Sequence, residues 1–122
     1  MKKRYFSINN QLFTEEEAKL NISDLAIQRG YGIFDFLKTI NGKAIFIDDH
    51  FNRFYASASA LNLYVKYDRK TLLNMVYELM EHNQLLDSGI KIILTGGFST
   101  DGYTLAEPNL IINQTPFKLD EK

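Results

Sequence analysis

An Asn-Gly pair at Asn41 and Gly42 is the feature that most constrains what this sequence can fold into. Asn-Gly between two strands is typical of a two-residue hairpin turn, because both residues tolerate the positive φ that such a turn needs. Residues 32–40 before the pair alternate between the two faces of a strand, and the apolar residues 44–47 follow it. The sequence therefore predicts an antiparallel hairpin, with 44–47 as its second strand.

Two segments after this hairpin have the apolar periodicity of amphipathic helices. The first is residues 49–61, with Asp48 and Asp49 as acidic residues at its start. The second begins at Asp68. The side chains expected on the buried faces of the two helices are Phe51, Phe54, Tyr55, Ala58 and Leu61 in the first, and Leu72, Leu73, Val76, Leu79 and Met80 in the second. Ser23-Asp24 is expected to cap a further short helical turn.

The remaining strands are short. Residues 4–8 and 11–13 flank Asn9-Asn10 and are typical of a hairpin. Residues 90–95 and 109–113 are apolar strands on either side of a glycine-rich loop. The helices are grouped between hairpins and do not alternate with single strands, which favours an α+β fold with a mostly antiparallel sheet of about six strands and two main helices.

Length and composition limit the function classes. The chain has 122 residues, of which 45% are hydrophobic and 24% charged, and this fits one globular domain. A net charge of -1 with no basic stripe predicts no nucleic acid partner and no binding to anionic membranes. No apolar run is long enough for a signal peptide or a bilayer span, and there is no cysteine. We expect a cytoplasmic protein.

The end of the sequence has the composition of a linker. Thr115-Pro116-Phe117 follows the last predicted strand, and a charged tail runs from Lys118 to Lys122. We therefore assign residues 1–114 to one domain and 115–122 to the start of an interdomain linker, with a second domain absent from this sequence.

The residues by themselves contain no familiar catalytic set. His50 and His82 lie on predicted helix faces without metal-type partners at suitable spacing, so we predict no metal site and a surface or capping role for each. Gly30-Tyr31-Gly32 follows no predicted strand and lacks the third glycine of a dinucleotide-binding fingerprint.

Arg53, Lys91 and the loop 95–103 each allow a structural and a functional interpretation. Arg53 could form a helical ion pair with Asp49, or its planar guanidinium could clamp an anion such as phosphate. Lys91, between two isoleucines of a strand, could point to solvent or line a cavity. The loop 95–103 could be a long hairpin connection or could contact a ligand.

The segment from Asp24 to Leu61 resembles the first domain of class IV aminotransferases. This family includes branched-chain and D-amino acid aminotransferases and aminodeoxychorismate lyase. The resemblance rests on Gly32-Ile33-Phe34-Asp35, then the Asn-Gly hairpin, then His50-x-x-Arg53-x-x-x-Ser57. Weaker similarity extends through residues 90–113. The resemblance implies the small N-terminal domain of the fold type IV enzymes.

The resemblance also implies a cofactor and site residues. Arg53 stands where the family places the arginine that binds the phosphate of pyridoxal 5'-phosphate (PLP). Phe34 occupies an aromatic position that lines the substrate pocket. Arg29 and Lys91 fall at pocket-wall positions, and either could pair with a substrate carboxylate. Tyr103, together with Asp101, lies in the loop that reaches the substrate site of the neighbouring subunit in relatives.

Some positions depart from the family pattern. Many relatives have Gly-Asp-Gly where this chain has Gly30-Tyr31-Gly32, and Glu where it has Asp35. The D-amino acid enzymes hold the substrate carboxylate with Arg and His in the loop that here carries Asp101 and Tyr103. These residues argue against D-amino acid specificity, and a branched-chain substrate remains one candidate.

The expected function is that of an N-terminal fragment of a PLP-dependent aminotransferase, which transfers an amino group between an amino acid and a 2-oxo acid. In the family, the lysine that binds the cofactor lies in a second domain. No lysine here matches it, so we assign no catalytic residue and expect the chain alone to be inactive. Relatives are homodimers, and we expect self-association. The alternatives are a fragment of an aminodeoxychorismate lyase-type enzyme or a non-catalytic binding domain on the same fold.

Overall fold

A computed structural model describes residues 3–116 of the chain. Its strands and helices, in chain order, are β1 (Tyr5–Ile8), β2 (Gln11–Thr14), α1 (Leu25–Gln28), β3 (Gly32–Ile40), β4 (Lys43–Ala44), α2 (Ile47–Ala60), α3 (Arg69–Asn83), β5 (Ser88–Thr95) and β6 (Leu110–Pro116). The six strands form one sheet in the order β2-β1-β6-β5-β3-β4, and all neighbouring strands are antiparallel. The predicted α+β fold with two main helices is confirmed.

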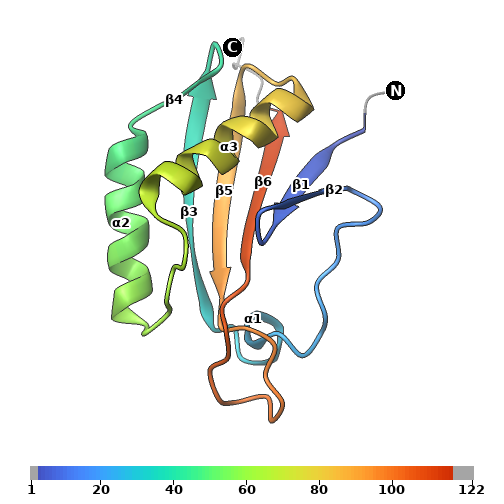
Figure 1. Cartoon of the computed structure of the whole chain (residues 1–122), viewed down its shortest axis with the longest axis vertical. Helices are drawn as coiled ribbons and strands as arrows, with labels where there is room; N and C mark the ends of the chain where they lie inside the picture. The colour runs from blue at the N-terminus through green and yellow to red at the C-terminus, as the bar shows by residue number, and fades with distance from the viewer. Residues whose placement is uncertain (1–2, 117–122) are drawn as a thin grey trace, which may run out of the picture.

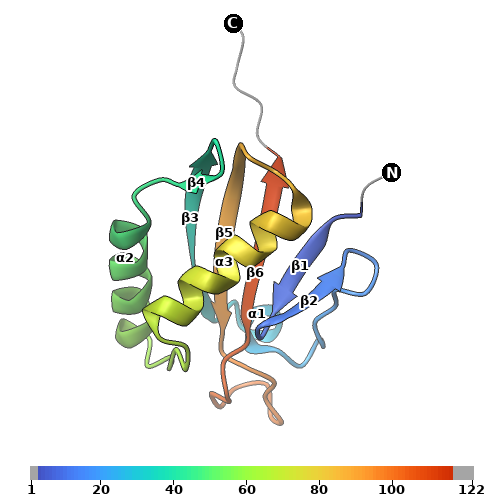
Figure 2. The same ribbon diagram turned by 45° about the horizontal axis from the view of Figure 1, so that its top comes forward.

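The two long helices lie on one side of the sheet (Figures 1 and 2). Helix α3 crosses in front of β5 and β6, and α2 runs beside β3. The core fills the space between these helices and the sheet, where side chains such as Phe54, Leu79 and Ile92 are almost completely buried. Burying each of them contributes about 2 kcal/mol through the hydrophobic effect.

The opposite face of the sheet is not crossed by any helix in the described part of the chain. Phe34 and Phe36 of β3 point to this side and expose 63% and 45% of their surface. Side chains of consecutive strand residues point to opposite faces, so Asp35 between them faces the helices. We call the side with Phe34 and Phe36 the open face.

The local turn signals are confirmed. Asn41 and Gly42 have φ values of 52° and 77°, so both central residues of the β3–β4 turn are left-handed, as Asn-Gly predicts. Asn9 and Asn10 between β1 and β2 also have positive φ, at 52° and 67°. Asp24 caps α1 by accepting a hydrogen bond from Ala26 N at 2.8 Å.

The predicted strand at 44–47 was wrong. Strand β4 ends at Ala44, and α2 begins at Ile47, two residues before the predicted start. Ile45 N still donates to Lys38 O at 2.8 Å, but Phe46 then adopts φ 55° and reverses the chain into the helix. A short apolar run fits the start of a buried helix as well as a strand, and periodicity over four residues does not separate the two.

The last strands are longer than predicted. Strand β5 begins at Ser88, and β6 continues to Pro116, which pairs with Ser88. Thr115 and Pro116, assigned above to the linker, therefore belong to the sheet, while 117–122 lie outside the described residues. Within residues 3–116, no helix is both long and apolar enough to cross a bilayer.

The shortness of β4 positions the candidate site. It pairs only with Thr39 and Ile40 at the end of β3. Residues 32–38 of β3 pair with β5 on one side, and on the other side no strand pairs with them within the described chain. We call this stretch the free edge of β3. Helix α2 lies beside it (Figure 1).

Candidate functional site

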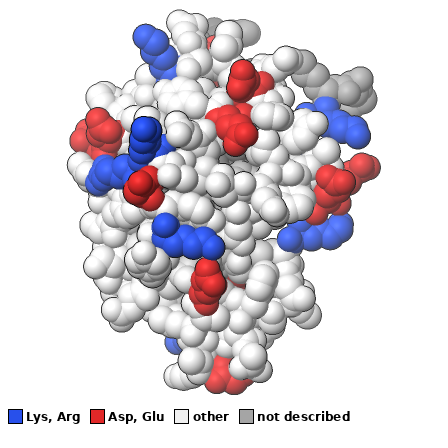
Figure 3. All heavy atoms as spheres, viewed as in Figure 1, with Lys and Arg blue, Asp and Glu red and all other residues white. Residues whose placement is uncertain are grey.

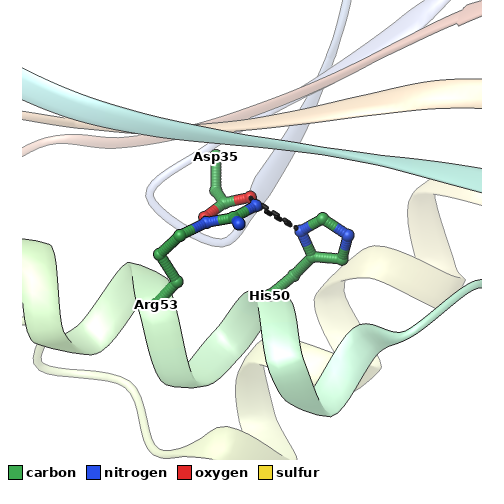
Figure 4. A network of polar contacts seen from close by, with 3 residues as sticks. All are labelled: Asp35, His50 and Arg53. Atoms are coloured by element: carbon green, nitrogen blue, oxygen red, sulfur yellow. Dashed lines mark hydrogen bonds and ion pairs between the residues drawn. The ribbon is translucent and has the colours of Figure 1, made fainter.

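Asp35 is a buried acid in the middle of β3. Only 4% of its surface is exposed, and it lies on the helix-facing side of the sheet together with Leu37. A buried carboxylate needs several donors to replace its lost hydration. Arg53 Nε donates to Oδ2 and Arg53 Nη2 to Oδ1, both at 2.8 Å, and His50 Nδ1 lies 2.8 Å from Oδ1. Figure 4 shows the three side chains converging between β3 and α2. We call them the Asp35 cluster.

Helix α2 brings the two basic residues to the carboxylate. His50 and Arg53 are three positions apart, so they lie on neighbouring points of one helix face. The buried Phe51 and Phe54 fix the rotation of the helix against the sheet. The Arg53 side chain remains 64% exposed and that of His50 19% exposed, so the Asp35 cluster opens to solvent at the free edge.

Arg53 and His50 keep the carboxyl group of Asp35 ionised. Burial raises the pKa of Asp35, but the hydrogen bonds and charges of Arg53 and His50 outweigh burial and hold that pKa below its ordinary value. The hydrogen bond to Asp35 in turn raises the pKa of the Arg53 guanidinium. At neutral pH, Asp35 is therefore a carboxylate that carries a bound guanidinium.

His50 is more than a surface residue, so the prediction of a surface or capping role was wrong for it. Its Nδ1 lies 2.8 Å from Asp35 Oδ1 and 2.9 Å from Arg53 Nη2. With the proton on Nδ1, the ring donates to the carboxylate, and we assign this tautomer because the acceptor is charged. His82 remains on the surface of α3, with Nδ1 3.0 Å from Glu78 O.

The alternative ion pair of Arg53 with Asp49 is not formed. Arg53 donates to Asp35 through Nε and Nη2, and its Nη1 has no partner among residues 3–116. An exposed guanidinium with one edge held and Nη1 free to donate fits a phosphate group, whose oxygens accept hydrogen bonds from such a planar donor. The donor chemistry of this site therefore suits an anionic cofactor.

Phe34 and Lys91 lie together on the open face. Lys91 Nζ is 5.1 Å from the centre of the Phe34 ring, a cation–π contact. Both line a shallow hollow of about 200 Å³, whose other lining residues are Ala26, Gly30, Gly32, Ile33 and Ile93. A cation beside an aromatic ring in a hollow could receive a small carboxylate, so the geometry accommodates the cavity interpretation of Lys91.

Arg29 and Tyr103 form a separate group at the end of the sheet near α1. Arg29 Nη1 donates to Tyr103 O at 2.8 Å, and the guanidinium carbon lies 4.3 Å from the centre of the Tyr103 ring and 5.1 Å from that of Tyr31. Arg29 thus ties the end of α1 to the loop between β5 and β6.

Asp101 is used within the same loop. It accepts hydrogen bonds from the backbone and hydroxyl of Thr104, from Tyr103 N and from the hydroxyl of Ser99. These donors, with the Thr104 backbone first, hold the pKa of Asp101 far below its ordinary range. These bonds within the loop indicate that Asp101 shapes its conformation.

The predicted site residues therefore form three groups. Arg53 is with Asp35 and His50 on the helix side, Phe34 is with Lys91 on the open face, and Arg29 is with Tyr103 at the sheet end. Phe34 and Asp35 are adjacent in β3, so the first two groups approach the same free edge from its two faces.

Sequence reasoning missed Asp35 and His50 as members of the site. One signal was present: Asp35 lies on the same strand face as the apolar Ile33 and Leu37. An acid on a core-facing position demands a cation or several donors nearby. Which residues meet that demand depends on how the helix docks.

The described residues contain no metal-type cluster. No group of three or more His, Cys, Asp or Glu side chains among residues 3–116 could hold a metal ion. On the face that carries α2 and α3, basic and acidic residues are interspersed (Figure 3).

Comparison with known proteins gives consistent results. Residues 32–122 match the family described as amino-transferase class IV. The chain is 30% identical over 101 residues to the D-alanine aminotransferase of Staphylococcus epidermidis, covering 83% of this chain and 36% of that protein. It is 29% identical over 90 residues to the D-alanine aminotransferase of Listeria monocytogenes, covering 74% and 31%.

Solved structures similar to this chain include branched-chain aminotransferases. The enzyme from Thermoproteus uzoniensis with norvaline superposes with a TM-score of 0.81 at 25% identity, covering 95% of this chain and 41% of that one. The enzyme from Escherichia coli reaches 0.83 at 18% identity, covering 95% and 42%. A third, solved with pyridoxamine 5'-phosphate, reaches 0.87 at 16% identity, covering 100% and 42%. The last two show the fold alone. The chain thus spans about a third of the length of the curated relatives described above.

Proposed function

The chain belongs to the class IV aminotransferases, and on that premise we propose that it forms the N-terminal domain of a PLP-dependent enzyme that transfers an amino group between an amino acid and a 2-oxo acid. In this proposal, residues 1–114 with the end of β6 make the domain, and a second domain follows the linker. The relatives are longer than this chain, which supports a further domain.

The observation that carries the proposal is the state of Arg53. Its guanidinium is charged, exposed and held along one edge by Asp35, with Nη1 unbonded among the described residues. We propose that Arg53 binds the phosphate of PLP at the free edge of β3. PLP, when bound, supplies an electron sink that stabilises negative charge on the amino acid carbon. A phosphate held by a fixed guanidinium anchors the cofactor while the rest of it moves.

The open face supplies the proposed substrate wall. Phe34 gives an apolar surface at the free edge, and Lys91 beside it offers an ammonium group to a substrate carboxylate. A carboxylate in a partly apolar hollow gains more from a single cation than it does in water. In this proposal, Arg29 and Tyr103 fix the position of the loop between β5 and β6. Arg29 is also a second candidate partner for the substrate carboxylate.

The catalytic lysine is proposed to lie in the second domain. Covalent attachment of PLP and proton transfer both need an amine, and in this proposal Lys91 serves as a carboxylate partner while the second domain supplies that amine. Incubating the chain with PLP and borohydride should therefore label no single lysine stoichiometrically. Labelling of one defined lysine in the chain alone would show that this domain carries its own catalytic amine.

The hand of the amino donor has opposing indications. The two D-alanine aminotransferases favour a D-amino acid. Asp101 and Tyr103 stand where the D-amino acid enzymes have Arg and His, and Asp101 is occupied by its own loop. We therefore favour an L-amino acid with an apolar side chain. The test is to compare D-alanine and L-leucine as amino donors to 2-oxoglutarate in an assay of the full-length protein. Faster turnover of D-alanine would reverse this choice.

Self-association is the proposed state of the enzyme, with sites near the subunit interface. The apolar side chains exposed on the open face support it, because exposed aromatic residues in a group mark interaction surfaces. Light scattering of the isolated chain should show dimers or larger species. A monomer at all concentrations would remove this part of the proposal.

Arg53→Ala in the full-length protein tests the central claim. We expect PLP retention during dialysis to fall by at least about tenfold, because a charged hydrogen-bonding group is removed from the phosphate, while melting of the PLP-free protein changes little. Ser59→Ala, at an exposed position of the same helix, is the control. Equal effects of Arg53→Ala on retention and on melting would identify a structural arginine. If the unsubstituted full-length protein retained PLP but had no transaminase activity, the lyase or the binding-domain alternative would be favoured. Release of pyruvate from aminodeoxychorismate would then identify the lyase, and its absence the binding domain.

A further inference from the structure

We infer that Asp35 is a positioning residue, which holds the Arg53 guanidinium in the orientation that receives the phosphate, and that His50 in turn fixes Asp35. This inference rests on the proposed function and concerns residues that touch Arg53 and not the cofactor. The starting observation is the pattern of hydrogen bonds. Asp35 engages Arg53 through Nε and Nη2, which form one edge of the guanidinium, and leaves Nη1 unbonded among the described residues.

A free arginine side chain samples many rotamers, and binding an anion freezes them at a cost in entropy. Two hydrogen bonds of 2.8 Å from Nε and Nη2 fix both the position and the plane of the guanidinium before any ligand arrives. A planar donor that is already fixed loses less entropy per bond to phosphate. Asp35 can act in this way because it is only 4% exposed and lies in the middle of β3, where the sheet holds it in place. The Arg53 side chain is 64% exposed, so little else in the structure restricts it.

His50 completes the arrangement from the other side. Oδ1 of Asp35 has Arg53 Nη2 and His50 Nδ1 at 2.8 Å, so the carboxylate plane is set by two residues one turn apart on α2. Without His50 the carboxylate could rotate and let the guanidinium follow. His50 therefore acts on Arg53 through Asp35 and needs no contact with the cofactor.

Electrostatics alone predicts the opposite effect for Asp35. The negative charge of this residue lies beside Arg53 and repels a phosphate dianion. If the Asp35 cluster acted only by charge, Asp35→Asn would tighten phosphate binding. If Asp35 acts by orientation, the same substitution weakens it, because asparagine offers one acceptor oxygen and no longer holds both Nε and Nη2.

The readout is the preference of the full-length protein for PLP over pyridoxal, which lacks the phosphate. Dissociation constants of both compounds, measured by fluorescence titration, give a ratio that isolates the phosphate contribution. We expect Asp35→Asn to lower this preference by about tenfold, the size of effect that orienting partners have at metal sites. His50→Ala should lower it by a smaller factor, and Ser59→Ala, at an exposed position of the same helix, should not change it.

A double substitution distinguishes positioning from an independent contribution. Lysine at position 53 has no planar edge to be held, so Asp35→Asn added to Arg53→Lys should cause no further loss of the preference. Thermal melting of each PLP-free variant checks that it folds. If Asp35→Asn does not fold, His50→Ala carries the test, since it keeps the bidentate Asp35–Arg53 pair.

The outcomes separate this inference from the proposed function. Should Arg53→Ala keep the full preference for PLP, the phosphate is not at Arg53 and the proposed function fails. Should Arg53→Ala abolish the preference while Asp35→Asn leaves it unchanged or raises it, Arg53 is the phosphate residue and only the positioning role of Asp35 is overturned.

Discussion

Two buried aspartates of this domain are satisfied in different ways. Asp35 is held by a charged guanidinium and an imidazole at the free edge of β3. Asp24 has no exposed surface and accepts only from neutral donors: Ala26 N and, at Oδ2, the Thr95 hydroxyl at 2.7 Å and the Asn109 amide at 2.8 Å. We call this second group the Asp24 cluster.

The Asp24 cluster joins distant parts of the chain. Thr95 ends β5, Asn109 precedes β6, and Asn109 Oδ1 accepts from Asn9 Nδ2 in the β1–β2 turn at 2.9 Å. The Thr95 hydroxyl also accepts from Gly97 N at 3.1 Å, which starts the loop. These polar atoms bond to one another and to the backbone, so the arrangement serves the fold.

The Asp35 cluster differs because one of its hydrogen-bond donors, Arg53 Nη1, is not used within the cluster. Arg53 keeps Nη1 unbonded among the described residues and most of its surface in solvent. A purely structural ion pair does not require a guanidinium turned outward. The comparison separates a buried acid whose partner is charged, exposed and incompletely bonded, and so can still bind a ligand, from a buried acid whose donors are all neutral and enclosed.

The largest expected effect is that of Asp24→Asn on stability. The amide replaces one acceptor oxygen with a donor, which leaves a buried hydroxyl, amide or backbone N–H without its partner and out of reach of water. We expect a loss of about 3 kcal/mol in the free energy of unfolding, measured by urea denaturation of the chain. A loss below that of the same substitution at Asp35 would break the comparison.

The second effect is that of Asp35→Asn on stability, measured by the same urea denaturation. Arg53 can turn to water when its partner weakens, so we expect a clearly smaller fall in the urea midpoint than for Asp24→Asn. The matched substitution makes the two positions directly comparable. Equal midpoints for the two variants would indicate that Asp35 is as structural as Asp24.

The third effect is a pH dependence carried by Asp35. Its pKa in the folded state lies below its ordinary value, since the bonds from Arg53 and His50 outweigh burial. Its contribution to stability is therefore complete above the unfolded pKa of about 3.9 and is lost as the pH falls through the lower folded pKa.

The stability difference between the natural chain and Asp35→Asn should shrink from about pH 6 to about pH 2.5. Urea midpoints of both proteins at each pH give this difference. Asp101→Asn is a control at a second acid whose pKa is lowered, since it should leave the Asp35 difference unchanged. A difference that stays constant over this range would contradict an ionised Asp35.

The smallest effect is that of salt. Raising NaCl from about 0.1 M to about 1 M shortens the screening length from about 10 Å to about 3 Å and weakens exposed charge interactions. The cost of Asp35→Asn should fall slightly, while the cost of Asp24→Asn should not change, because its donors are neutral. A salt-dependent Asp24 effect would reveal a charged partner near it.

Much of the fold followed from local signals in the sequence. Asn41-Gly42 requires positive φ at two successive residues, and Asp24 and Asp68 cap the helices that follow them. These preferences act between residues a few positions apart, so they are legible without knowledge of the packing. The prediction at 44–47 failed because four apolar residues could begin a helix or complete a strand, and contact with the core decided between them.

For the candidate site, the sequence determined the chemistry of the residues and the tertiary structure determined their partners. Sequence spacing allowed Arg53 to pair with Asp49, and the resemblance alone favoured the phosphate role. Docking of α2 beside the free edge of β3 brought Arg53 to Asp35, 18 positions away. It also placed Phe34 on the opposite face from Arg53. Local preferences act along the chain, but the position of a helix against a sheet depends on how whole surfaces pack, and no spacing in the sequence records it.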